Sequence, residues 1–537
     1  MSEPEVKKQR TDNGVSEAKV LPEEALRPGI LDPKFQDELR DSIRNSDPYK
    51  HGVIHGLLND KLLRQAREEI LEHLHFTQKE TDIYKVNQTG DLANLSGLDT
   101  DELSKLKAVA KVREGLYSKE FREMMSYVTD CGPLSGKQQD LSINLYNKGC
   151  HLLNHDDVIG TRRISYILYL VPPDTPWDPK WGGSLRLFPI EQPGVPAADF
   201  SKEIPPEWNQ LSFFKVQPGY SFHDVEEVYV DQPRLSISGW FHIPHPDEPG
   251  YDANILAEDD GSKATLAQLS GRGDSHHFEP YTDDEKAELS EADKEYLGEF
   301  INQDVLDRVP SLLETFTSAS VLTIANFLKP DVFDKIAQAT EVDDLAKIPK
   351  TEKDISAPWQ LAKPSHIRHY MFIANDEQVP ATEDLAAHVE LQKIRDFIVS
   401  PQFGRFVNAI TSLEPKSRYA EARRFRPGHD FTLATGLPQD ALLEATLHLT
   451  SAKWSDDVGG YEMLMATEDN DDDPAVYRAA AESMVLHSSA PVANELVIYL
   501  REKEVLQFVK YVSRNAPSSR WDVAAEFEVD FGDEEDK

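Results

Sequence analysis

The chain has 537 residues, of which 28% are charged and 39% hydrophobic, and its formal net charge is −38. At about 150 residues per domain, this length predicts two to three domains. No apolar run approaches the ~18 residues that a membrane helix needs, and the first residues lack the apolar segment of a secretion signal, so we expect neither membrane insertion nor secretion. The acidic excess disfavours binding to nucleic-acid phosphates and suits a basic protein partner.

Two cysteines, Cys131 and Cys150, are too few for a disulfide framework. This composition is typical of a reducing compartment, and we expect the protein in the nucleus and the cytoplasm. Residues 1–28 are polar, charged and without apolar periodicity, which predicts disorder. They include the basic cluster Lys7–Arg10, which resembles a nuclear import signal but is of a common type.

Three helices are predicted after this segment. Asp32 and Pro33 are typical of the N-cap and first position of a helix. A second helix follows Asn59, with apolar residues recurring at helical spacing, and Thr100 is a candidate cap for the third.

From about residue 139 the apolar period changes from helical to extended. Short runs rich in β-branched and aromatic residues are separated by Gly, Pro and Asn turns, which predicts many short antiparallel strands. We expect a β-rich α+β fold for residues 29–248, with the preceding helices packed on a jelly-roll sheet. The predicted strands are 141–146, 164–170, 184–188, 212–216, 225–230 and 235–241.

The chain then changes character and the first pattern recurs. Residues 249–300 are acidic and are predicted to form a solvated connector with one helix near its end. Beyond it, Phe425–Gly428 matches Tyr146–Gly149 at an offset of 279 residues, and later strands and turns match in the same order. Residues 301–537 are therefore predicted to be a second copy of the β-rich fold.

One set of residues in the first copy carries the pattern of a metal site. His155 and Asp157 flank one residue, so on an extended segment both side chains point to the same side. His223 follows 68 residues later and Arg234 another 11 residues on, each at the start of a predicted strand. Two histidines and a carboxylate form the facial triad of non-haem Fe(II) enzymes. Three other His-x-Asp/Glu pairs lack this context; they begin at His245, His277 and His388.

Several segments around this pattern resemble a known family. The chain is similar to the 2-oxoglutarate/Fe(II) dioxygenases of the prolyl-hydroxylase branch, and more narrowly to the fungal ribosomal prolyl hydroxylases, also called the termination and polyadenylation factor family. The resemblance implies two tandem double-stranded β-helix domains, the second without a metal site. The segments that carry it are 81–95, 144–157, 162–170 and 181–188.

The resemblance also implies roles for individual residues. Arg234 would pair with the distal carboxylate of 2-oxoglutarate, Tyr169 would hydrogen-bond to the same group, and Tyr146 would lie at the active-site mouth. Residues 81–95 would form a mobile loop over the substrate. Trp240 is expected to fill the core, and Asp156 to point away from the metal. The implied Fe(II) ligands are His155, Asp157 and His223, with O2 as co-substrate and ascorbate as the reductant.

In the second copy these residue types are missing at the offset positions. Ala434 and Gly436 take the places of His155 and Asp157, Gln507 that of His223, and Ser518 that of Arg234. The second domain is therefore expected to bind no iron and to serve in docking, stability or partner binding.

The implied substrate is a proline of a basic small-subunit ribosomal protein, hydroxylated at C3 and in fungal members also at C4, with an effect on translation termination. Four alternatives stay open. The chain could be an oxygen-linked regulatory binding protein for a transcription or translation factor, or a dioxygenase acting on another protein. A nucleic-acid demethylase would normally need a basic groove, which this composition disfavours. A zinc hydrolase would leave Arg234 without a task.

Overall fold

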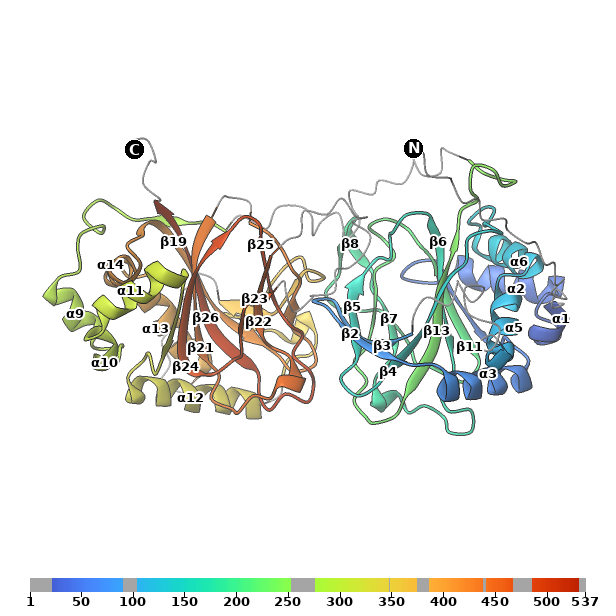
Figure 1. The fold of residues 1–537 in the computed structure, drawn as a ribbon, viewed down its shortest axis with the longest axis horizontal. Coiled ribbons are helices and arrows are strands. Elements are labelled where there is room, and N and C mark those ends of the chain that lie inside the picture. Colours follow the sequence, from blue (N-terminus) through green and yellow to red (C-terminus); the bar gives the residue numbers. More distant parts are fainter. Residues whose placement is uncertain are drawn as a thin grey trace, which may run out of the picture.

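The computed structural model describes residues 22–89, 104–252, 276–346, 348–373, 386–437, 441–466 and 485–530. Figure 1 shows two β-rich halves side by side, with helices at the two outer ends of the elongated molecule and strands between them. No helix among these residues is long and apolar enough to cross a membrane. Some predicted features lie outside the described residues: Lys7–Arg10, Thr100, 90–95 of the predicted loop and 253–275 of the predicted connector.

The helices of the first half cover one face of its sheet. Asn59 and Ser118 cap two of them by accepting hydrogen bonds from backbone N–H groups, an interaction worth about 1 kcal/mol. Residues 22–28 are not disordered as predicted, because Ala25 and Leu26 are buried in the same core. The helices are α1 Pro22–Ala25, α2 Pro33–Arg44, α3 Asp60–His73, α5 Lys107–Leu116 and α6 Lys119–Thr129.

The large sheet of the first half has the strand order β1-β11-β6-β13-β4-β3-β5-β12-β7-β10, with β2 paired to β3. Every pairing is antiparallel. The short strands β8 Ile190–Gln192 and β9 Val195–Pro196 pair separately. The strands of the sheet are β1 His51–His55, β2 Thr77–Glu80, β3 Tyr84–Gln88, β4 Asp140–Tyr146, β5 His151–His155, β6 Arg162–Tyr169, β7 Leu185–Leu187, β10 Lys202–Ile204, β11 Gln210–Lys215, β12 His223–Val225 and β13 Arg234–His242.

Two sequence predictions need correction here. The strand expected over 225–230 is instead β12, which starts at His223 and ends at Val225. The residues after it turn toward the second half, where Glu227 accepts hydrogen bonds. The loop predicted over 81–95 contains β3, which is held in the sheet by β2, β4 and β5.

The second half repeats this plan with its own core. Its helices are α9 Glu291–Leu297, α10 Gln303–Leu306, α11 Val309–Ala319, α12 Pro330–Leu345, α13 Ala387–Ile398 and α14 Pro401–Thr411. Its strands are β14 Glu279–Pro280, β15 Val321–Ala325, β16 Gln360–Leu361, β17 Arg368–His369, β18 Met371–Ile373, β19 Glu414–Phe425, β20 Phe431–Thr432, β21 Ala441–Leu449, β22 Glu462–Ala466, β23 Val485–Ser489, β24 Ala493–Glu502, β25 Val505–Val509 and β26 Arg520–Asp530.

The large sheets of the two halves share their strand order. The run β15-β24-β21-β26-β19-β18 follows the same path as β1-β11-β6-β13-β4-β3. In both, two long strands near the C-terminal end of the half pair along most of their length. Positions can therefore be matched through the hydrogen-bonded registers instead of through sequence identity.

The predicted connector is too long at its C-terminal end. Tyr281 and Leu297 are buried in the core of the second half, and β14 pairs with β19 of its sheet. His276 stacks on Tyr419 with ring centroids 4.1 Å apart. Residues 276–300 therefore belong to the second half, because their apolar side chains complete its core.

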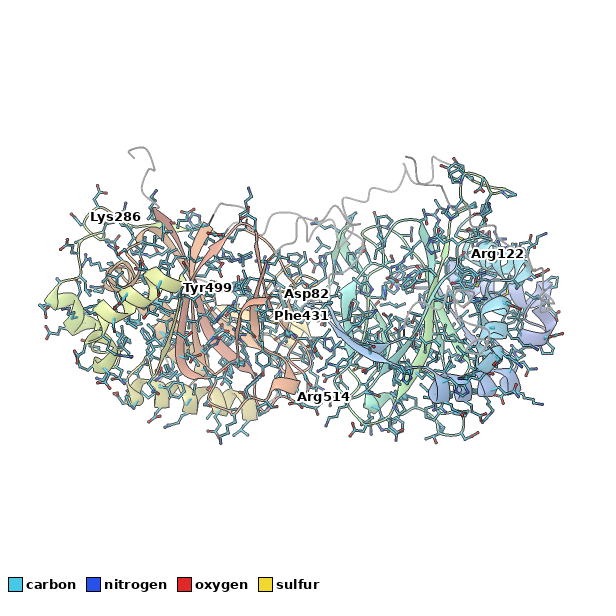
Figure 2. All side chains as sticks on the ribbon, in the orientation of Figure 1. Asp82, Arg122, Lys286, Phe431, Tyr499 and Arg514 are labelled. Atoms are coloured by element: carbon cyan, nitrogen blue, oxygen red, sulfur yellow. The ribbon has the colours of Figure 1, made fainter. Side chains whose placement is uncertain are left out.

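The two halves contact each other through buried polar and apolar groups. Figure 2 labels Asp82, Phe431 and Arg514 between the halves. The carboxylate of Asp82 accepts a hydrogen bond from the Ala434 N–H at 2.9 Å, and Glu227 accepts one from the Arg514 N–H at 2.8 Å. The apolar part of the contact consists of Ile83, Leu153, Ile367, Phe431, Leu433 and Tyr511.

Candidate metal centre

His155, Asp157 and His223 meet at one buried point of the first half. His155 ends β5, His223 begins β12, and the two residues are opposite each other in the antiparallel ladder. The ligand atoms of the three side chains all lie within 4.8 Å of one another. Within the described ranges, this is the one group of three or more His, Cys, Asp or Glu residues with such spacing.

Asp157 reaches the site through a turn, which corrects the geometry expected from the sequence. Strand β5 ends at His155, and Asp157 has a φ of 61°. This left-handed conformation is unusual for a non-glycine residue but is tolerated by Asp. It brings the carboxylate to 3.4 Å from Nε2 of His155 and 3.6 Å from Nε2 of His223. Asp156 points away, as expected, and accepts the Gly219 N–H at 3.0 Å.

Backbone carbonyls orient both imidazoles. Nδ1 of His155 lies 2.8 Å from the Leu153 carbonyl oxygen, and Nδ1 of His223 lies 2.9 Å from that of Ser221. A carbonyl can only accept, so each Nδ1 carries the proton and each Nε2 presents a lone pair toward Asp157. This outer-shell arrangement is the usual one for metal-binding histidines.

The carboxylate of Asp157 is held by two further side chains. Its Oδ2 accepts hydrogen bonds from Ser165 Oγ at 2.7 Å and from Trp240 Nε1 at 3.0 Å. The guanidinium of Arg162 lies 3.6 Å from Oδ1 and 3.5 Å from the Trp240 ring centroid. Trp240 is half-buried and is not the core residue that the sequence predicted, because its indole N–H serves the metal carboxylate.

The charges of the three side chains follow from this packing. Burial opposes ionisation of Asp157, but the two histidines and Arg162 hold its pKa well below the usual value. Burial lowers the pKa of His223 to about 4, helped by the positive charge of the neighbouring His155. Burial also acts against His155, yet Asp157 raises its pKa. A buried carboxylate beside imidazole lone pairs is a donor set that suits Fe(II).

A second polar group lies buried beside this cluster without a full set of partners. Arg234 is completely buried at the start of β13, and its Nε donates to the Gly183 carbonyl at 2.6 Å. Its Nη1 and Nη2 have no hydrogen-bond partner, and neither does the hydroxyl of buried Tyr169. Leaving such groups unpaired costs ~1–3 kcal/mol each. A carboxylate bound between them would satisfy all three, since a guanidinium binds carboxylates in a bidentate manner.

Tyr146 and Gly183 shape the space around Arg234. The guanidinium carbon lies 4.8 Å from the Tyr146 ring centroid and 4.9 Å from that of Tyr169. Tyr146 is buried opposite Arg234 in the β4–β13 ladder, so its ring supports the arginine and does not lie at an open mouth. A Cβ at Gly183 would lie 2.7 Å from Cδ of Arg234, so only glycine fits there.

The structure thus brings together all six residues that the sequence singled out. Three contributors were missed: Ser165, Arg162 and the indole N–H of Trp240. Their roles depend on contacts between strands far apart in the chain. The RRIS segment before the strand and the Trp at the far end of β13 gave no separate signal.

In the second half, the registers replace two of the residue matches expected from the sequence. His223 is opposite His155, whereas Gln507 is opposite Thr435, so Thr435 and not Ala434 stands in the place of His155. The position two residues on is Leu437 and not Gly436. A one-residue shift before β20 ends the constant offset of 279.

The position of Arg234 is also occupied differently from the expectation. Arg234 is opposite Tyr146, and Arg520 is opposite Phe425, so Arg520 and not Ser518 is its counterpart. Arg520 also donates to a glycine carbonyl, that of Gly460, at 2.7 Å.

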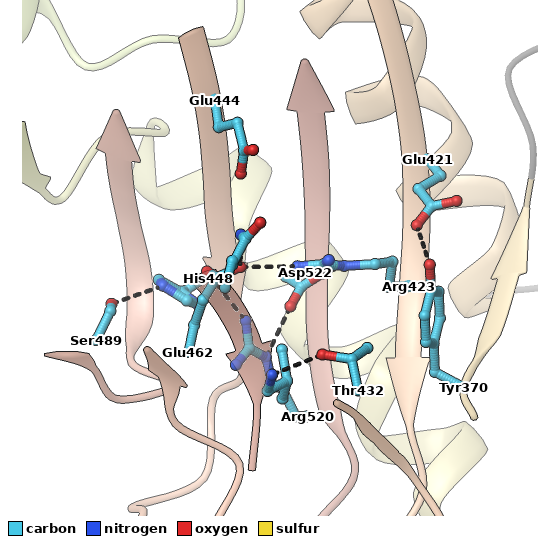
Figure 3. Close-up of polar contacts among 12 residues, drawn as sticks. Tyr370, Glu421, Arg423, Thr432, Glu444, His448, Glu462, Ser489, Arg520 and Asp522 are labelled. Atoms are coloured by element: carbon cyan, nitrogen blue, oxygen red, sulfur yellow. Dashed lines mark hydrogen bonds and ion pairs between the residues drawn. The ribbon is translucent and has the colours of Figure 1, made fainter. Parts of the chain in front are cut away.

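The surroundings of Arg520 differ from those of Arg234. Its Nε donates to Asp522 at 2.7 Å, and Glu462 lies 3.5 Å from Nη2 (Figure 3). Asp522 also accepts from Arg423 at 2.6 Å, and nearby His448 is paired with Ser489 at 2.9 Å. The carboxylates of the chain itself therefore take the place that a bound carboxylate would fill beside Arg234.

Comparison with known proteins agrees with this geometry. A model of the 2OG-Fe(II) oxygenase superfamily matches residues 141–242, and one described as "Oxoglutarate and iron-dependent oxygenase degradation C-term" matches residues 292–535. The chain is 34% identical over 516 residues to prolyl 3,4-dihydroxylase OGFOD1 of Ostreococcus tauri, covering 92% of this chain and 98% of that protein.

More distant matches extend the comparison. The chain is 25% identical over 525 residues to prolyl 3-hydroxylase OGFOD1 of Mus musculus, covering 88% of this chain and 85% of that protein. Among solved structures, a Pseudomonas putida prolyl-4-hydroxylase aligns at a TM-score of 0.28 and 20% identity, over 38% of this chain and 98% of that one.

Proposed function

This chain belongs to the 2-oxoglutarate- and Fe(II)-dependent oxygenases, and within that family we propose that it hydroxylates a prolyl residue of a protein substrate. The observation that carries the proposal is the pairing, in one buried site, of a 2-His-1-carboxylate group with an arginine and a tyrosine that lack partners. The names of the relatives, prolyl 3-hydroxylase and prolyl 3,4-dihydroxylase, support the prolyl substrate.

The residues present fit the cofactors of this family. His155, Asp157 and His223 would hold Fe(II), and Arg234 with Tyr169 would bind the distal carboxylate of 2-oxoglutarate. When bound, iron and 2-oxoglutarate use O2 to insert one oxygen atom into a C–H bond, with 2-oxoglutarate converted to succinate and CO2. We propose ascorbate as the reductant that keeps the iron ferrous.

The protein supplies position, charge and exclusion of water. Leu153 and Ser221 carbonyls fix the imidazole rings, and Ser165 with Trp240 fixes the carboxylate. The complete burial of Arg234 strengthens its attraction for an anion, because the local dielectric is lower than that of water.

We infer that the substrate is a basic ribosomal protein of the small subunit, hydroxylated at C3 with a second hydroxylation at C4, and that the modification affects translation termination. The net charge of −38 supports a basic partner through electrostatic steering. The nucleus and the cytoplasm, where ribosomal proteins are assembled and used, are the proposed locations.

We further propose that the second half is a tandem copy of the jelly roll that has lost its metal site. The shared strand order supports the duplication. Thr435, Leu437 and Gln507 at the ligand positions support the loss, because their side chains offer neither an imidazole nor a carboxylate.

The test combines turnover and mass spectrometry. Purified protein with Fe(II), 2-oxoglutarate and ascorbate should release succinate in the presence of proline-containing peptides from small-subunit ribosomal proteins, with a mass gain of one oxygen atom on a proline. Ribosomal proteins from cells lacking the protein should lose that modification. Succinate release without any modified proline would point to another substrate, and no turnover at all would favour a regulatory binding role.

A further inference from the structure

A polar cavity of about 240 Å³ lies in the second half, against the face of the sheet formed by β19, β26 and β21. We propose that it binds the cationic side chain, arginine or lysine, of a basic protein partner. This site is separate from the iron centre and does not depend on catalysis.

The walls of the cavity come from facing positions on adjacent strands. Tyr419, Glu421 and Arg423 alternate along β19, opposite Glu526, Ala524 and Asp522 of β26. On the other side of β26, Glu444 and Thr446 of β21 are opposite Glu526 and Ala524. The small side chains of Ala524 and Thr446 leave room in front of Glu421.

The cations that line the cavity already have partners. Arg501 donates to Glu444 at 2.9 Å, Arg423 to Asp522 at 2.6 Å, and His276 lies 2.9 Å from a carboxylate oxygen of Glu526. Arg368 donates to the Lys363 carbonyl at 2.6 Å. None of these groups is placed to neutralise Glu421.

Glu421 is the carboxylate without a countercharge. It is 5% exposed, lines the cavity, and has no Lys, Arg or His nitrogen within 4.0 Å in the part of the chain that the structure describes. Its two oxygens accept hydrogen bonds from Tyr370 Oη at 2.7 Å and from Tyr419 Oη at 2.9 Å (Figure 3 shows the first). Phenols satisfy the lone pairs but not the charge, and a buried charge is costly unless it is paired.

The remaining lining favours a cation over other ligands. Tyr370, Tyr419 and Phe278 present aromatic rings, which attract guanidinium and ammonium groups by cation–π interaction. Glu528 is a second lining carboxylate; it is exposed and takes a hydrogen bond from Ser417 but no cation among the described residues. The volume suits a side chain better than a whole metabolite, since pockets for drug-sized ligands usually have roughly 300–1,000 Å³.

A protein is the source of the cation that the charge of the chain favours. With a net charge of −38, the chain attracts basic proteins over long distances, and an exposed Glu528 near the cavity would meet their side chains first. A dicarboxylic anion is disfavoured, because the arginines of this region are paired with carboxylates of the chain.

The probe for the experiment is the blocked peptide acetyl-Gly-Arg-Gly-amide, titrated into the full chain and followed by ligand-observed NMR. A peptide with citrulline in place of arginine is the matched neutral probe, and a lysine peptide tests the ammonium group. We expect the arginine and lysine peptides to bind at least tenfold more tightly than the citrulline peptide. Glu421→Gln should remove this preference, whereas Glu299→Gln, at an exposed glutamate of the same half, should keep it.

Two further variants keep the test decisive. Ala524→Leu should block binding by filling the cavity, which provides a readout if Glu421→Gln folds poorly. His155→Ala should leave peptide binding unchanged even if the hydroxylase proposal fails. Equal binding of the citrulline and arginine peptides, or full binding by a folded Glu421→Gln protein, would overturn the proposal.

Discussion

Arg234 and Arg520 begin matching strands of the two halves, and each donates to the carbonyl of a matching glycine, yet their surroundings are opposite. Arg234 keeps two buried guanidinium nitrogens without partners, whereas Arg520 is paired with Asp522 and Glu462. The sheet fixes where an arginine stands, and the residues facing it decide whether it can bind a ligand.

The facing residues can be identified position by position. Ser236 is opposite Tyr169 in the first half, and Asp522 is opposite His448 in the second. A serine and a phenol leave the positive charge of Arg234 unmatched, while an aspartate neutralises Arg520. Loss of an anion site thus requires no loss of the arginine.

The largest expected effect comes from removing an iron ligand. His155→Ala should abolish succinate release and iron binding, a larger loss than the roughly 10–100-fold that an outer-shell substitution costs. The fold should survive, because no core packing depends on the imidazole. His245→Ala is the matched control, since it alters an exposed His-x-Asp pair, and it should keep full activity. An active His155→Ala enzyme would place the iron elsewhere.

The two arginines should respond in opposite ways to truncation. Arg234→Ala removes a charge-assisted contact worth ~1.5–3 kcal/mol, so the KM for 2-oxoglutarate should rise roughly ten- to hundredfold. Iron affinity, measured in parallel by competition with a chelator, should change little.

Arg520→Ala should leave that KM unchanged and destabilise the protein instead. It strands the buried carboxylates of Asp522 and Glu462, and breaking a buried pair typically costs ~3–5 kcal/mol. Urea unfolding of both variants measures the contrast. If both arginines changed KM, or neither changed stability, the distinction between the two sites would be wrong.

Much of this architecture could be predicted from sequence, and the errors have a common physical cause. Short β-branched runs between Gly and Pro turns located most strands, and the spacing of His155, Asp157 and His223 identified residues that the fold brings together. The constant offset failed near Thr435 and Arg520, because strand register is fixed by backbone hydrogen bonds and absorbs inserted residues that sequence comparison does not see. Trp240 could not be assigned either, since its N–H acts only through a tertiary contact.

Trp240 offers a smaller test of how the first half holds its carboxylate. Trp240→Phe keeps an aromatic ring but removes the donor to Asp157, while Ser165 still donates. We expect about a tenfold loss of iron affinity, the low end for an outer-shell partner. Trp208→Phe removes an indole donor to Asp60, outside the site, and serves as the control. Equal iron affinities for the two variants would assign Trp240 to packing alone.

The position of Trp240 in the second half is held by Glu526, which changes the pH dependence of that half. Glu526 lies against His276, and although burial lowers the affinity of the imidazole for protons, Glu526, with Glu421 and Glu444 nearby, raises the pKa of His276 to about 9. A raised pKa in the folded state stabilises the fold fully below the unfolded value of ~6.5, and the contribution is lost as the pH rises through 9.

The free energy of unfolding should therefore fall by the order of 1–3 kcal/mol between about pH 6.5 and 9.5, and this loss should be absent in His276→Gln. Urea titrations of both proteins across this range measure the difference, and subtracting the two curves removes the contributions of all other titrating groups. His245→Gln, at an exposed histidine of the first half, should follow the unmodified protein. If His276→Gln lost stability over the same range as the unmodified protein, the His276–Glu526 pair would not be the source of the pH dependence.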